Sequence, residues 1–224
     1  MNAAGVSVCG VDNQGCGRSE ALGGVRFYVD SFEDYVADVL QLAEEVSGGQ
    51  HGPGFSGLPL FVGGISLGGC IALNAVLQRR PLFRGLALLA PMLSLDHVSR
   101  KGLNPYLRHV GALLSWLVPT AAIVATDKNT MHPDIQLGWD HDPLVCHGRS
   151  RVRNATEYLR ATEATMARLE EAELPLIIFH SENDTMCDSE GSKQLYLRAK
   201  VRGGGWLSSR GGEGGGWEES SAGC

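Results

Sequence analysis

The chain has 224 residues, of which 43% are hydrophobic and 20% charged, and its formal net charge is −6. This composition is typical of a globular protein with one sizeable core, and the negative charge without a dense Lys/Arg cluster argues against nucleic-acid binding. The six cysteines form no C-x-x-C pair, which favours free thiols in a reducing compartment over a disulfide framework.

Neither a secretory leader nor a membrane span is predicted. Residues 1–12 lack a basic region followed by a long apolar stretch. The longest uncharged stretch, residues 110–126, is at the short limit for a membrane-spanning helix and has Pro119 in its middle. An apolar surface element can still contact a membrane, so a cytoplasmic or peripheral membrane location is expected.

Four apolar stretches read as buried strands, and the stretch at 83–93 is apolar enough to be buried on both faces. The expected strands are residues 6–12, 58–66, 83–93 and 174–180. A turn at residues 13–17 bounds the first of them, and a Gly/Pro/His loop at 47–57 precedes the second.

Helical patterns separate these strands. The first helix is predicted to begin at Ser31, with Asp34 at the third helical position completing a capping box. The expected helices are residues 31–46, 70–80, 103–118, 154–172 and 188–200. Strands that alternate with helices predict an α/β fold with a parallel, doubly wound sheet.

The last residues differ in composition from the rest of the chain. Residues 201–224 consist largely of glycine runs with serines and glutamates between them. Such a segment is expected to form no strand and to be disordered, so residues 1–200 make up the predicted domain.

A G-x-S-x-G motif at Gly64 to Gly68 joins the second strand to the following helix. This is the order of elements in a nucleophile elbow, where a sharp turn presents a serine hydroxyl above the sheet. Glycine at Gly64 and Gly68 is expected to relieve steric clashes in the turn. Ser66 then lies at the positive N-terminal end of a helix, where the Leu67 N–H can face an oxyanion. A glycine-rich turn with a solvent-facing serine is the alternative.

Four segments, in the same order, resemble the monoacylglycerol lipase/lysophospholipase branch of the serine-aminopeptidase-like α/β-hydrolases. The resemblance covers about residues 5–200 and rests on Asp12-Asn13-Gln14-Gly15-Cys16-Gly17-Arg18-Ser19, on residues 31–38, on Gly64 to Gly69, and on His180-Ser181-Glu182-Asn183-Asp184 with Gly191-Ser192.

The resemblance implies roles for particular residues. It implies Ser66 as the nucleophile, Asp184 as the triad acid and the Leu67 N–H as an oxyanion donor. It also implies that residues 95–167 form a helical cap over an acyl pocket, consistent with an apolar insertion between two parallel strands. No cofactor and no metal are expected, and the expected partner is a small lipid or ester substrate, with membrane contact through the cap left open.

Two parts of the family pattern have no counterpart in the sequence. In this fold the base histidine follows the acid, but no histidine follows Asp184. His180 corresponds to the end of a strand and is not assigned as the base. The family's His-Gly oxyanion loop and a strand of the sheet would precede Gly5, and the final strand also lacks a counterpart. A chain shortened at both ends accounts for these differences.

Three functions therefore remain open. The first is a serine hydrolase that cleaves carboxylic esters, such as a monoacylglycerol or lysophospholipid lipase, through an acyl-enzyme on Ser66. The second is an inactive fragment of this fold, because loss of the base costs several orders of magnitude in rate. The third is a peptidase on the same scaffold. A metal site at Asp140-His141-Asp142 and Cys146-His147 is less favoured than a solvated polar loop.

Overall fold

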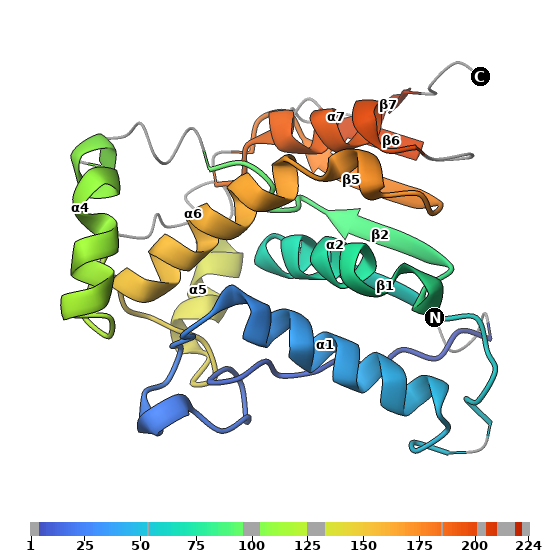
Figure 1. The fold of residues 1–224 in the computed structure, drawn as a ribbon, viewed down its shortest axis with the longest axis horizontal. Coiled ribbons are helices and arrows are strands. Elements are labelled where there is room, and N and C mark those ends of the chain that lie inside the picture. The colour runs from blue at the N-terminus through green and yellow to red at the C-terminus, as the bar shows by residue number, and fades with distance from the viewer. Residues whose placement is uncertain are drawn as a thin grey trace.

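In a computed structural model, the chain forms one five-stranded sheet with helices packed against it (Figure 1). The structure describes residues 5–52, 54–95, 104–124, 133–184, 186–200, 205–209 and 218–220. The strands of this sheet are β1 (Phe61–Ile65), β2 (Gly85–Leu89), β5 (Leu176–Ser181), β6 (Gly205–Ser209) and β7 (Glu218–Ser220). The helices are α1 (Phe32–Ser47), α2 (Leu67–Arg79), α4 (Asn104–Leu117), α5 (Pro133–His141), α6 (Val152–Met166) and α7 (Ser189–Arg198).

The sheet has the strand order β1-β2-β5-β6-β7, in which β1, β2, β5 and β6 are parallel and β7 is antiparallel. This arrangement confirms the predicted parallel α/β fold. Short 3₁₀ helices occur at Leu22–Gly24, Arg80–Leu82 and Leu169–Glu171, and a separate two-stranded sheet pairs β3 (Ala122–Val124) with β4 (Ser150–Arg151).

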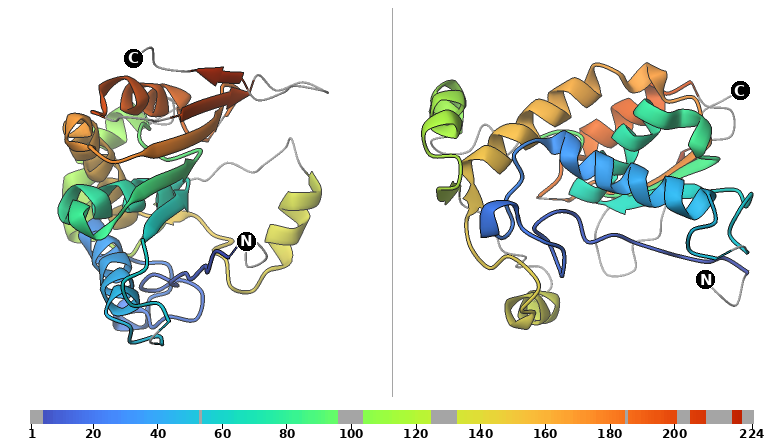
Figure 2. Two further views of the ribbon diagram at one scale, coloured as in Figure 1. Left: turned by 90° about the vertical axis from the view of Figure 1, so that its right-hand side faces the viewer. Right: turned by 60° about the horizontal axis from the view of Figure 1, so that its bottom comes forward.

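One face of the sheet holds the hydrophobic core. Leu88 and Ile178 are aligned across neighbouring strands and are at most 1% exposed, and α2 and α7 pack against these strands. Figures 1 and 2 show α1, α2, α6 and α7 together on this face. The prediction that the 83–93 strand would be buried on both faces is wrong, because Ala87 and Leu89 point to the opposite face and are exposed.

The helix boundaries follow from local sequence. Ser31 begins α1 as predicted, and its backbone N–H donates to Asp34 Oδ2 at 3.3 Å in a capping box. Helix α7 begins after Asp188, whose side chain accepts the Glu190 N–H. The 154–172 prediction is too long, since α6 ends at Met166 and a 3₁₀ turn follows.

The N-terminal segment differs from the prediction. Residues 6–12 form no strand, and Val6 and Val8 are 49% and 64% exposed. A cavity of about 280 Å³, lined by residues of this segment, α1, α2 and β1, separates the segment from β1. Because a strand requires a neighbour for its backbone hydrogen bonds, this spacing leaves residues 6–12 extended but unpaired with β1.

The C-terminal segment also differs from the prediction. Gly205–Ser209 forms β6, which pairs in parallel with β5, and Glu218–Ser220 forms β7 beside it. Trp206 is 6% exposed and its ring meets that of Tyr196 edge-on, with centroids 5.9 Å apart. The prediction of a strand-free tail was wrong for these residues, since pairing with β5 and burial of one aromatic ring compensate for the high glycine content around them.

Helices α4 and α5, from the segment between β2 and β5, lie outside the main layer of helices and are called the lobe below (Figures 1 and 2). Helix α4 lies at one end of the molecule and packs on α6, while α5 projects away from the sheet (Figures 1 and 2). Helix α6 also packs on α1 and α2, and its Ala161 belongs to the core, so most of α6 belongs to the main layer of helices. No helix among the described residues is long and apolar enough to cross a membrane.

Candidate active site

Ser66 lies in the turn that joins β1 to α2. Its backbone has φ 50° and ψ −118°, a region that residues other than glycine rarely adopt and that costs on the order of 1–3 kcal/mol. Four hydrogen bonds hold the turn: the Ser66 N–H donates to the Leu89 carbonyl, and the Ser66 carbonyl accepts from the N–H groups of Gly69, Cys70 and Met92. The strain is therefore imposed by β1, α2 and the segment after β2. This is the geometry that the G-x-S-x-G motif predicts.

The glycines around Ser66 have unequal roles. A Cβ atom on Gly64 would overlap the Gly68 carbonyl group, which confirms the predicted need for glycine there. A Cβ atom on Gly68 would meet nothing within 4 Å, so the prediction for this position is wrong. The second constrained position is Gly69, where a Cβ atom would lie 2.6 Å from Pro91 Cβ.

Leu67 is the first residue of α2, directly after Ser66. The first N–H groups of a helix have no partner within the helix and carry its positive end. The Ser66 side chain makes no capping hydrogen bond to these groups. The Leu67 N–H is thus placed where the sequence predicted an oxyanion donor, and that role stays a prediction.

Asp184 lies in the turn after β5, where its N–H donates to the Ser181 carbonyl at 3.2 Å. Its Oδ1 atom accepts the backbone N–H groups of Met186 at 2.8 Å and Cys187 at 2.9 Å. Burial opposes ionisation of this carboxyl, but contact with His180 and the two N–H groups lowers its pKa below the ordinary value. Asp184 is therefore an ionised, firmly oriented carboxylate at neutral pH.

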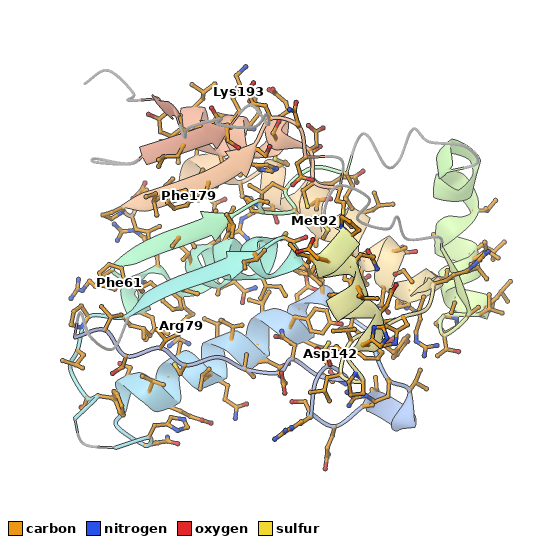
Figure 3. The ribbon with its side chains drawn as sticks, turned by 180° about the vertical axis from the view of Figure 1, so that it is seen from behind. Phe61, Arg79, Met92, Asp142, Phe179 and Lys193 are labelled. Atoms are coloured by element: carbon orange, nitrogen blue, oxygen red, sulfur yellow. The ribbon has the colours of Figure 1, made fainter. Side chains whose placement is uncertain are left out.

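Cys187 connects the two predicted residues. Its Sγ atom lies 3.4 Å from Ser66 Oγ, and its backbone N–H binds Asp184. Ser66 and Asp184 thus lie at the same edge of the sheet, where the carboxyl ends of parallel strands place functional groups. In Figure 3, Met92 lies near this edge, and Phe61 marks the opposite end of β1. No sequence pattern points to Cys187, because its position depends on the path of the loop after Asp184.

His180 and His51 are engaged by groups other than Ser66. His180 is 1% exposed and its Nδ1 atom lies 2.7 Å from Ser192 Oγ. His51 pairs with Glu45 at the end of α1. His97 and His132 are outside the described residues. No histidine hydrogen-bonds to Ser66 in the described part of the chain.

The polar cluster of the lobe binds backbone groups. His141 Nδ1 lies 2.7 Å from the Leu137 carbonyl oxygen, and His147 Nε2 lies 2.9 Å from that of Trp139. Asp142 accepts the Leu144 N–H. Within the described ranges, no three His, Cys, Asp or Glu side chains are grouped as metal ligands.

The family model described as "Serine aminopeptidase, S33" matches residues 1–204, which is most of the chain. The chain belongs to this serine aminopeptidase S33 family. The predicted family resemblance is thereby confirmed, and the Ser66 elbow lies within the matched range.

Curated relatives in the S33 family carry lipase names. The chain is 28% identical to the "Monoglyceride lipase" of Homo sapiens over 194 residues, and 25% identical to the "Monoacylglycerol lipase" of Mycolicibacterium smegmatis over 200 residues. These matches cover 84% and 88% of this chain, and 59% and 67% of the two relatives. The chain thus spans about three fifths of the length of the human enzyme.

Solved structures confirm the fold. The monoacylglycerol lipase of Paleococcus ferrophilus aligns with a TM-score of 0.70 at 20% identity, over 87% of this chain and 70% of that one. A soluble variant of the Saccharomyces cerevisiae monoglyceride lipase, in complex with a substrate analogue, aligns with a TM-score of 0.68 at 21% identity, over 88% and 66%. This member of the S33 family therefore has the α/β-hydrolase fold.

Proposed function

We propose that this chain carries the nucleophile and acid of a serine hydrolase that cleaves carboxylic esters, with a monoacylglycerol or similar lipid ester as substrate. The strained backbone of Ser66 is the observation that carries the proposal, because such strain at a strand-to-helix corner serves to present a reactive hydroxyl. The lipase names of the family relatives support the choice of substrate.

In the proposed reaction Ser66 Oγ attacks the ester carbonyl carbon and gives up its proton to a base; the bond to the alcohol oxygen breaks, and the alcohol leaves with that proton. Water then hydrolyses the acyl-enzyme, which releases the carboxylic acid and restores the Ser66 hydroxyl. The Leu67 N–H stabilises the oxyanion of the tetrahedral intermediate. The ionised Asp184 orients and stabilises a protonated base. The sequence contains no histidine after Asp184, so this chain on its own is expected to react slowly.

Labelling with a fluorophosphonate probe tests the nucleophile. Ser66 is expected to be labelled slowly, and the Ser66→Ala variant is the matched control that should lose the label. Added imidazole should accelerate labelling of the wild-type chain, since a free base can replace a missing one. Absence of Ser66 labelling from a folded chain, with and without imidazole, would contradict the catalytic proposal and favour the inactive-fragment alternative.

A second part of the proposal concerns membrane contact by the lobe between β2 and β5. In α4 the residues Val110, Leu113 and Trp116 are 44%, 57% and 73% exposed, while Ser115 on the other side is 2% exposed. Helix α5 adds Ile135 and Leu137, each 60% exposed. Apolar residues at helical spacing on an exposed face are typical of elements that lie in a membrane interface.

Sedimentation with phosphatidylcholine vesicles tests this contact. The double variant Leu113→Ser, Trp116→Ser is expected to weaken vesicle binding by roughly tenfold or more, since each large side chain contributes about 1.5–3 kcal/mol on leaving water. Leu197→Ser is the matched control, because Leu197 is 64% exposed but lies on α7 of the main domain. Equal vesicle binding by the two variants would refute the role of the lobe.

A further inference from the structure

His180 is a buried histidine that the proposed reaction does not use. It occupies the fifth position of β5 and faces the core side, with an exposed fraction of 1%. A fully buried histidine is stable only when its ring nitrogens have suitable polar neighbours. The neighbours of His180 therefore indicate what the ring does.

The two ring nitrogens face different groups. Nδ1 lies 2.7 Å from Ser192 Oγ, a hydrogen-bond distance, and Ser192 is itself 0% exposed on α7. Nε2 lies 3.4 Å from Asp184 Oδ2, within ion-pair distance but without the alignment of a hydrogen bond. Among the described residues Nε2 has no other polar partner. The ring thus bridges the buried serine and the proposed acid.

This arrangement distinguishes the two neutral forms of the ring. If Nδ1 carried the proton, the lone pair of Nε2 would face the ionised Asp184 carboxylate, and two acceptors would repel each other where water is excluded. If Nε2 carries the proton, it points toward the carboxylate and Nδ1 accepts the Ser192 hydroxyl proton. Only the second form keeps two acceptors from facing each other while Nδ1 accepts from Ser192.

We propose that His180, held by Ser192, is a positioning residue for Asp184: it carries its proton on Nε2, 3.4 Å from Oδ2, and this electrostatic contact holds the carboxylate on that side. The Met186 and Cys187 N–H groups fix the other oxygen. Asp184 is thereby oriented before any base binds to it. This role rests on the proposed function only in taking Asp184 as the catalytic acid.

The lowered pKa of Asp184 agrees with this arrangement. Burial raises the pKa of this carboxyl, but the contact with His180 and the two backbone N–H groups together lower it by more. The other titratable group beside this carboxylate is the Cys187 thiol, whose pKa is raised by its own burial and by the charge of Asp184. The thiol and the carboxylate thus disfavour each other's ionised forms. Among the side chains that act on Asp184, His180 is the one whose contact lowers the pKa of this carboxyl, together with the two backbone N–H groups.

Nuclear magnetic resonance of the ring nitrogens tests the proposal without any mutation. The full chain is measured over a series of pH values that extends to alkaline pH. The expected result is a His180 ring protonated at Nε2 and bare at Nδ1. A ring protonated at Nδ1 would overturn the proposal. This result does not depend on Ser66 reactivity, so it separates failure of the positioning role from failure of the proposed hydrolase function.

A matched pair of variants tests the effect on Asp184, read from the carboxyl carbon signal as the pH is changed. In His180→Gln the side-chain amide can still donate from the position of Nε2, whereas in His180→Asn it reaches only the position of Nδ1. The asparagine variant should raise the pKa of Asp184, because the contact that lowers it is lost, and the glutamine variant should retain most of the wild-type behaviour. An equal shift in both, or none in the asparagine variant, would overturn the role. If the asparagine variant does not fold, the wild-type protonation pattern decides.

Discussion

The Cys187 thiol lies 3.4 Å from the Ser66 hydroxyl, on the loop that also carries Asp184. Burial, together with the charge of Asp184, raises the pKa of this thiol above its ordinary value. The contact therefore sets a neutral sulfur beside the proposed nucleophile.

The first prediction concerns the reactivity of Cys187. A raised pKa means that the reactive thiolate forms only at a higher pH. Alkylation of Cys187 by iodoacetamide should therefore be slower than that of an exposed thiol near pH 7–8 and should rise at more alkaline pH. Mass spectrometry of peptides containing Cys187 and the exposed Cys9 measures both rates in one sample. Matching pH profiles for the two cysteines would contradict the prediction.

The second prediction concerns the glycines of the elbow. Gly64→Ala should destabilise the fold by about 1–3 kcal/mol or more, because its new methyl group overlaps the Gly68 carbonyl group. Gly68→Ala is the matched control: it enters open space in the first turn of α2 and should leave the free energy of unfolding unchanged or raise it by up to about 1 kcal/mol. Denaturant unfolding of both variants measures the difference. A smaller loss of stability for Gly64→Ala than for Gly68→Ala would show that the turn has a different shape.

The glycines of the elbow show which features can be predicted from local sequence and which cannot. The motif predicts a strand, a sharp turn and a helix, because their order and spacing are local properties. The constraint on Gly69 arises from Pro91, which lies in another strand connection. Such a contact depends on how β2 is placed beside β1, and no local pattern contains that information.

The rest of the fold likewise contains features that local sequence predicts and features that depend on contacts between distant segments. The capping residue Ser31 and the parallel order of the central strands were predictable from residue type and periodicity. Strand β6 was not, because its glycine-rich surroundings suggest disorder and its stability comes from β5. The buried contact of His180 with Ser192 likewise joins a strand to a helix twelve residues later.

The third prediction tests strand β6. Trp206→Ala should destabilise the fold by about 3–5 kcal/mol, because a nearly buried ring that packs against Tyr196 is lost. Leu207→Ala on the same strand is the matched control, since Leu207 is only half-buried, and it should cost less. Thermal and denaturant unfolding measure both variants. If Trp206→Ala left stability unchanged, the segment would not belong to the sheet.

The fourth prediction is a pH dependence of stability that belongs to Asp184. Its pKa is lowered in the folded state, so the unfolded chain binds the proton more tightly. The stability that the ionised carboxylate contributes is therefore present above the unfolded Asp value of about 3.9 and is lost as the pH falls through the lower folded value. Asp184→Asn should unfold more easily than the wild type at neutral pH, and the difference in free energy of unfolding should shrink below about pH 4.

Glu173→Gln, at an exposed position, is the control for loss of one negative charge. A difference between wild type and Asp184→Asn that stays constant from neutral to acidic pH would show that hydrogen-bond geometry, and not ionisation, holds the Asp184 loop.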